Sequence, residues 1–216
     1  MHSQEVIHRT AEHVKTLFSG EGTGHDWWHV YRVWKMAQGI GQAEGADPLV
    51  VELAALLHDI ADWKFHNGDL SIGPRKAKEW LDSLAVDSNV CEQVCQIVAN
   101  ISFKGAAVDS SPLSREGQVV QDADRLDAIG AVGIARAFAY GGFVKQSIHD
   151  PSVQPAEHRS AEAYFQGGGT TINHFYEKLL LLKDRMNTAA GRAVAARRHR
   201  FMEDFLRRFF QEWEGD

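Results

Sequence analysis

The stretch Leu56-Leu57-His58-Asp59-Ile60-Ala61-Asp62 places two ionisable side chains inside an apolar run. Adjacent His and Asp are common by chance, so the apolar setting of His58 and Asp59 carries more weight than the pair itself. Burying an imidazole and a carboxylate without partners costs several kcal/mol. A bound cation relieves that cost, so this stretch predicts one part of a buried metal site.

Apolar residues before this pair recur with the period of an α-helix. They are Leu49, Val50, Leu53, Leu56, Leu57 and Ile60. The same periodicity runs through nearly the whole chain, and no stretch alternates strictly enough to form a sheet. We therefore predict an all-α fold, with helices over residues 3–19, 26–44, 48–62, 71–86, 88–101, 113–126, 128–140, 171–186 and 188–213.

The length of 216 residues predicts a single domain, with the metal site in residues 20–145 and a helical extension in 170–216. A net charge of -6 argues against a nucleic-acid-binding surface or a polybasic membrane surface. The chain has a polar start and no apolar stretch of roughly 20 residues, so we expect neither a secretion signal nor a membrane span. Two cysteines, expected to be buried and reduced, favour a cytoplasmic location. One basic cluster is expected to be a solvated helix face: Arg192, Arg197, Arg198 and Arg200.

His29 and Asp124 complete a ligand set with His58 and Asp59. These groups fall on three predicted helices, as in the metal sites of helical bundles. Asp122 is the rival of Asp124 for the last position. Two imidazoles and two carboxylates suit Mn²⁺, Fe²⁺, Ni²⁺, Co²⁺ or Zn²⁺ better than Mg²⁺ or Ca²⁺. We expect one divalent ion, with Mn²⁺ as the first choice and Mg²⁺ as a further alternative.

Two neighbouring carboxylates are expected to support these ligands. Asp62 lies four residues after His58 and shares its helix face, where it could orient a water molecule or hold a ligand histidine. Asp26 is predicted to cap the helix that carries His29, because Asp is a favoured N-cap residue.

Three segments resemble the HD-domain superfamily of metal-dependent phosphohydrolases. They are Gly24–Val33 around His29, Leu56–Lys64 around the His-Asp pair, and Val120–Gly130 around Asp124. Residues 172–180 and 198–206 resemble a small bacterial subgroup of about this length, so the likeness covers nearly the whole chain.

The resemblance implies an all-α HD-domain bundle and the ligand set His29, His58, Asp59 and Asp124. Asp124 is preferred over Asp122 and Asp127 because the family's last ligand stands before Arg-Leu in several branches. At least one member of the similar subgroup hydrolyses nucleoside triphosphates, deoxy forms included, to monophosphate and pyrophosphate. We therefore expect this protein to be a metal-dependent phosphohydrolase that acts on nucleotides and cleaves (deoxy)nucleoside triphosphates in the same way.

A triphosphate carries about four negative charges, so cations are expected beside the ion. Lys64 and Arg125 are close to the ligands in sequence and are expected, with Asp62, to act in catalysis. Further side chains are predicted to contact the substrate: His25, Lys104, Asp127, His158, Arg159 and Lys178.

Two other functions stay open at this point. The same site could serve a nucleoside 5′-monophosphatase or another phosphomonoesterase. It could also stabilise a sensor or interaction domain that binds metal without catalysis. A homodimer is possible in each case.

Overall fold

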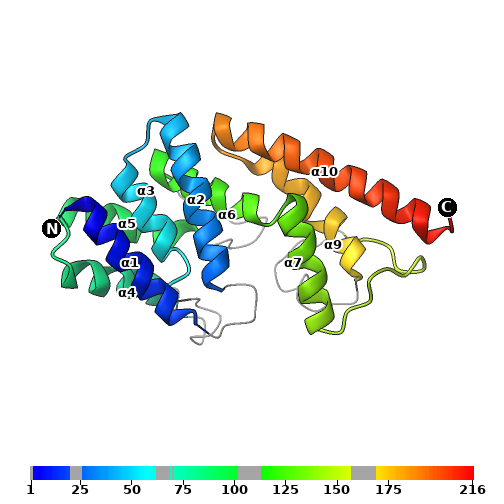
Figure 1. Ribbon diagram of the computed structural model, residues 1–216, viewed down its shortest axis with the longest axis horizontal. Helices are drawn as coiled ribbons and strands as arrows, with labels where there is room; N and C mark the ends of the chain where they lie inside the picture. The colour runs from blue at the N-terminus through cyan, green and yellow to red at the C-terminus, as the bar shows by residue number, and fades with distance from the viewer. Residues whose placement is uncertain (1, 20–25, 62–68, 70, 102–112, 157–168) are drawn as a thin grey trace. The chain divides into compact units, whose positions relative to one another are not determined.

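The computed structural model describes residues 2–19, 26–61, 69, 71–101, 113–156 and 169–216 (Figure 1). Every regular element in these ranges is a helix, which confirms the predicted all-α fold. The elements are α1 (Ser3–Leu17), α2 (Trp27–Glu44), α3 (Pro48–Leu57), α4 (Ile72–Ser83), α5 (Ser88–Ile101), α6 (Arg115–Asp127), α7 (Gly130–Phe143), α9 (Thr171–Glu177), the 3-10 helix η2 (Leu179–Arg185) and α10 (Ala189–Trp213).

The chain divides into two compact units, with the boundary after Ala123. The first unit holds α1 to α5 and most of α6. The second begins at Asp124, in the last turn of α6, and continues to Asp216. The single domain expected over residues 1–216 remains a prediction.

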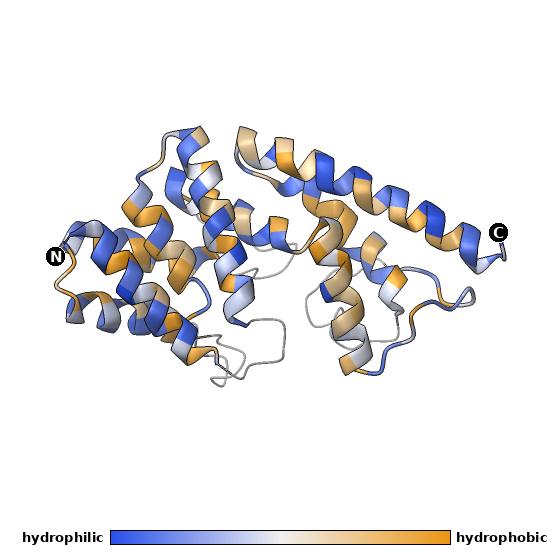
Figure 2. Ribbon diagram, viewed as in Figure 1, coloured by the Kyte–Doolittle hydropathy of each residue, from blue (hydrophilic) through white to orange (hydrophobic). Residues whose placement is uncertain are grey.

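Helix α3 forms the centre of the first unit, where it packs against α1, α2 and α5. From Val50 to Leu57 every residue of this helix is buried, and Figure 2 shows it as an almost entirely hydrophobic segment. Its start is well defined, because the Asp47 carboxylate accepts hydrogen bonds from the backbone N–H groups of Leu49 and Val50. An N-terminal cap of this kind fixes where a helix begins.

The end of α3 differs from the prediction, since the helix stops at Leu57 rather than at residue 62. His58 and Asp59 instead form a turn, in which the Ile60 N–H donates to the Leu57 carbonyl. The Ala55 carbonyl, which would accept from residue 59 in a continued helix, is 2.8 Å from the His58 Nδ1 atom. A side-chain contact therefore replaces the next helical hydrogen bond.

In the second unit, α10 packs against α7 and η2, and α9 packs against η2 and α7. Aromatic rings from three helices form the interior, with Phe175 stacked on Phe205 at 5.8 Å and Phe138 at 5.9 Å from Phe205. The predicted helix over 171–186 is wrong as a single element, because it breaks at Lys178 (φ -143°) into α9 and η2.

Within the described part of the chain, no helix is both long and apolar enough to cross a bilayer. The two cysteines of the sequence, Cys91 and Cys95, are free thiols one turn apart on α5. Burial raises the pKa of the Cys95 thiol to about 12, so this thiol is protonated at neutral pH.

Glu52 is a carboxylate inside the apolar helix α3 and is 9% exposed. Its Oε2 atom accepts hydrogen bonds from the Trp34 indole at 2.8 Å and from the Gln38 amide at 2.7 Å, both on α2. These bonds satisfy a buried carboxylate and join the two helices.

We predict that Glu52→Ala lowers the free energy of unfolding by about 1–3 kcal/mol, because it leaves the Trp34 and Gln38 donors without this acceptor. Urea denaturation followed by circular dichroism measures the change. Glu12→Ala on the exposed side of α1 is the control and should be nearly neutral. Equal losses of unfolding free energy in Glu52→Ala and Glu12→Ala would contradict the stabilising role of the Glu52 hydrogen bonds.

His174 on α9 gives the second unit a dependence on pH. Burial, and the nearby charge of Lys178, lower the pKa of this imidazole from 6.5 to about 4. As pH falls, the unfolded chain takes up this proton first, so the stability contributed by neutral His174 is full above pH 6.5 and is lost towards pH 4.

We predict that the native protein loses on the order of 3 kcal/mol of stability between these pH values through His174 alone. In His174→Gln this part of the pH dependence should be missing. Thermal melts at pH 7, 6, 5 and 4 measure it, with the exposed His8→Gln as control. A His174→Gln curve parallel to the native curve would contradict the prediction.

Candidate metal centre

His29 lies in the first turn of α2 and points into the first unit, with its side chain 1% exposed. The helix begins where the Asp26 carboxylate accepts a hydrogen bond from the His29 backbone N–H at 2.9 Å. Asp26 is therefore the N-cap, as predicted. This cap fixes the backbone of the turn that presents the imidazole.

His58 and Asp59 are held by the turn that follows α3. The Nδ1 atom of His58 is 2.8 Å from the Ala55 carbonyl oxygen. Because a carbonyl only accepts, Nδ1 must carry the proton and donate it. The Nε2 atom of the neutral ring then carries a lone pair. This arrangement is the one that metal-binding histidines commonly use to fix their tautomer and orientation.

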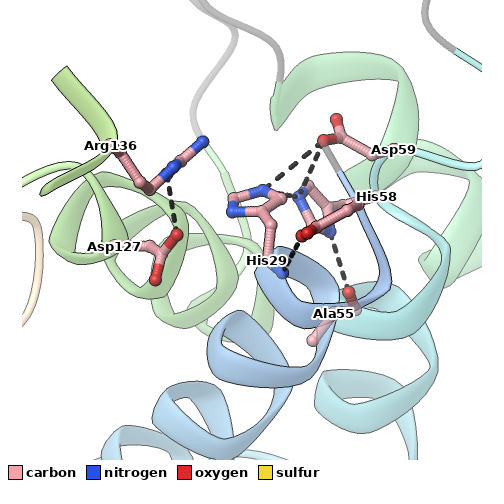
Figure 3. Close-up of polar contacts among 7 residues, drawn as sticks. His29, Ala55, His58, Asp59, Asp127 and Arg136 are labelled. Atoms are coloured by element: carbon pink, nitrogen blue, oxygen red, sulfur yellow. Dashed lines mark hydrogen bonds and ion pairs between the residues drawn. The ribbon is translucent and has the colours of Figure 1, made fainter. Parts of the chain in front are cut away.

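The two imidazoles and the Asp59 carboxylate converge on one point (Figure 3). The Nε2 atoms of His29 and His58 are 3.2 Å apart. Asp59 Oδ2 lies 3.5 Å from each of them. Ligand atoms about 2.1 Å from one ion lie about 3.0 Å apart along an octahedral edge and about 3.4 Å apart along a tetrahedral edge. The triangle of donor atoms therefore has the size that a single divalent ion requires.

The burial of the three groups differs in a way that suits a site open to small molecules. The His29 and His58 side chains are 1% and 2% exposed, whereas Asp59 is 21% exposed. The carboxylate thus forms the edge of the cluster nearest to solvent. Two imidazole nitrogens and a carboxylate oxygen are ligands that Mn²⁺, Fe²⁺, Co²⁺, Ni²⁺ and Zn²⁺ accept. His29, His58 and Asp59 can therefore hold a divalent metal ion.

Asp124, the predicted fourth ligand, belongs to the second unit and is partly buried in the last turn of α6. Its rival Asp122 is fully buried in the first unit. Asp127 is also buried, and its Oδ2 atom lies 2.7 Å from Nη1 of Arg136 on α7. The choice of Asp124 as a ligand, and the substrate contact predicted for Asp127, remain predictions.

Of the other predicted substrate and catalytic residues, Arg125 and Lys178 are described. The Arg125 guanidinium donates to the main-chain carbonyl of Arg185 in η2. Lys178 is partly buried at the junction of α9 and η2. Both roles remain predictions. Six further residues lie outside the described ranges: His25, Asp62, Lys64, Lys104, His158 and Arg159.

Sequence reasoning passed over Arg136, although a signal was present. It is the only charged residue of α7, whose other residues are apolar, glycine or tyrosine. The same signal, a polar group inside an apolar run, singled out His58 and Asp59. In the structure this arginine forms the ion pair with the buried Asp127.

A family model, a relative in sequence and solved structures all point to the same protein family. The HD domain model matches residues 27–129, which contain His29, His58, Asp59 and Asp124. YpgQ of Bacillus subtilis is 39% identical over 203 residues, which is 94% of this chain and 91% of YpgQ. A crystal structure of YpgQ in complex with ADP superposes with a TM-score of 0.76 and covers 98% of this chain and 97% of that one.

Two further crystal structures match over the whole length of both chains. An HD-superfamily hydrolase from Bacillus thuringiensis is 41% identical, with a TM-score of 0.80. A protein from Lactobacillus plantarum is 36% identical, with a TM-score of 0.83. On the combined basis of the family match and these full-length relatives, the chain belongs to the HD-domain superfamily.

Proposed function

We propose that the protein is a metal-dependent phosphohydrolase that cleaves nucleoside triphosphates, deoxy forms included, to a monophosphate and pyrophosphate. The observation that carries this proposal is the convergence of the His29, His58 and Asp59 donor atoms. Membership of a superfamily that includes a hydrolase from Bacillus thuringiensis supports a hydrolytic reaction.

The chemistry of the site suits hydrolysis of a phosphate ester or anhydride. A divalent ion in such a site lowers the pKa of a water molecule and withdraws charge from a phosphoryl oxygen. The protein side chains hold the geometry: Ala55 orients His58, and Asp26 fixes the turn of His29. Asp59 is 21% exposed, so we expect the substrate and a water molecule to reach the ion from its side.

A nucleoside polyphosphate is the substrate class that the relatives favour. YpgQ was solved in complex with ADP, whose adenine base and linked phosphates are also part of ATP and dATP. A net charge of -6 repels a polyphosphate at long range, so local cations must offset it. Lys64, Lys104 and Arg125 are the proposed cations, with Lys178, His25, His158 and Arg159 as further contacts.

Attack on the α-phosphorus is the reaction that we favour, with Asp62 holding the attacking water molecule. The alternative reactions give different products. A 5′-monophosphatase releases nucleoside and inorganic phosphate, and a sensor domain binds a nucleotide or a metal without turnover. The products therefore decide between these functions.

We predict that Mn²⁺-supplemented protein converts dATP to dAMP and pyrophosphate in equal amounts. Hydrolysis in H₂¹⁸O should place the label in dAMP, because the water oxygen bonds to the α-phosphorus. Anion-exchange chromatography and mass spectrometry measure both. A panel of nucleoside triphosphates with all common bases, together with the monophosphates, shows which nucleotides the protein hydrolyses fastest.

The control for contaminating enzymes is Asp59→Ala purified in the same way, which should be inactive. Release of inorganic phosphate from dAMP would support the monophosphatase instead. Absence of turnover of every nucleotide by metal-replete protein would contradict both enzymatic functions and favour the binding domain.

We also predict that the native protein binds one divalent ion per chain and that Asp59→Ala or His58→Ala loses it. Each variant removes one donor atom of the triangle. Inductively coupled plasma mass spectrometry of dialysed protein measures the stoichiometry. Asp124→Ala should lose the ion as well, while Asp122→Ala should keep it. The opposite pattern for these two variants would transfer the ligand role to Asp122.

A further inference from the structure

Three guanidinium groups hold the last turn of α6, which carries Asp124. Arg198 on α10 donates to the main-chain carbonyl of Leu126. Arg125 donates to the carbonyl of Arg185, and Arg136 on α7 pairs with Asp127 at 2.7 Å. Each contact ties this one turn to a different element of the second unit, namely α10, η2 and α7.

Arg198 differs from the other arginines of its cluster. Arg192, Arg197 and Arg200 are exposed, as expected for a solvated helix face, but Arg198 is partly buried. Burial lowers the pKa of its guanidinium, an effect that the charge of Asp127 opposes. A charged group is rarely withdrawn from water unless its donors are satisfied. The expectation of a solvated face is therefore wrong for Arg198.

The backbone after α6 is shaped to admit this side chain. Gly130 has φ 77°, a left-handed conformation that glycine adopts without strain. A Cβ atom at Gly130 would lie 2.9 Å from Cγ of Arg198, which is closer than real contacts allow. The stem of Arg198 thus passes directly against a position that lacks a side chain.

Arg198 contacts the C-terminal end of α6, where its charge acts on the helix dipole and its hydrogen bond acts on the backbone of the last turn. The Leu126 carbonyl is among the last four carbonyls of α6 and also accepts a hydrogen bond from the Ile129 backbone N–H at 3.2 Å. A cation there complements the negative end of the helix dipole. Asp124 is two residues earlier in the same turn, so a movement of the turn would also move its carboxylate.

We infer that Arg198 is a positioning residue, which fixes the last turn of α6 so that the Asp124 carboxylate is held ready as a metal ligand. This inference rests on the proposed function in one respect, the assignment of Asp124 as a ligand. Groups that orient a ligand without touching the metal commonly change metal affinity by 10–100-fold, roughly, when they are removed. Arg198 belongs to this class.

The test compares Arg198→Met with Arg200→Met, an exposed arginine two residues further along the same helix. Titration with Mn²⁺, in which electron paramagnetic resonance detects the free ion, gives Kd for each protein. We expect Kd to rise roughly tenfold in Arg198→Met and to stay unchanged in Arg200→Met. Circular dichroism at the titration temperature establishes that each variant is folded.

A double-mutant cycle with Asp124→Asn separates positioning from a general loss of stability. If Arg198 acts through Asp124, Arg198→Met should weaken Mn²⁺ binding in the native background but not in the Asp124→Asn background. Equal losses in both backgrounds would overturn the inference, because Arg198 would then act on the site by another route.

The remaining outcomes distinguish this inference from the proposed function. If Asp124→Asn binds Mn²⁺ more weakly while folded Arg198→Met binds it as tightly as the native protein, the inference on Arg198 is overturned and the proposed function stands. If Asp124→Asn binds Mn²⁺ as tightly as the native protein, Asp124 is not a ligand, and the inference on Arg198 is overturned with that assignment. If Arg198→Met does not fold, Arg198→Lys replaces it in the cycle. It keeps the charge but lacks the planar fork, so a smaller rise in Kd through Asp124 is expected.

Discussion

Two imidazole nitrogens face each other at 3.2 Å, a distance at which they can either share one N–H hydrogen bond or bind the same cation. The lone pair of His58 Nε2 is directed between them because Nδ1 donates to Ala55. The Asp59 carboxylate adds a negative charge 3.5 Å from both rings. A proton can satisfy only one pair of these atoms, whereas a divalent ion satisfies all three at ordinary bond lengths. The candidate function depends on this constraint.

The surrounding structure serves to keep these atoms in place. The cap at Asp26 fixes one imidazole, and the early end of α3 fixes the other. Helix α3 is buried from Val50 onward, so the turn that carries His58 and Asp59 begins from a packed helix. The conformational entropy of the ligand side chains is therefore lost during folding and not when the ion binds. Preorganised sites gain affinity in this way.

The all-α fold and the His58-Asp59 pair could be predicted from local signals in the sequence, whereas His29 came from the chemistry of the ligand set and the resemblance to the HD-domain superfamily. Helical periodicity is a local signal, and a His-Asp pair within an apolar run has to be satisfied when it is buried. The N-cap at Asp26 is local as well, and the structure has it where it was predicted.

The features that were not predicted depend on contacts between distant residues. The end of α3 at Leu57 follows from the His58 side chain, and the break at Lys178 has no local turn signal. Arg198 looked like its exposed neighbours, yet its carbonyl partner, Leu126, is 72 residues away. Spacing along a helix does not reveal such a partner, because tertiary packing selects it.

The most direct test of the metal centre is crystallographic. Data collected on either side of the manganese absorption edge, from crystals soaked in MnCl₂, locate the ion independently of the protein density. We expect one anomalous peak per chain about 2.2 Å from Nε2 of His29, Nε2 of His58 and a carboxylate oxygen of Asp59. Bound manganese at any other place, with these three side chains unliganded, would contradict the account.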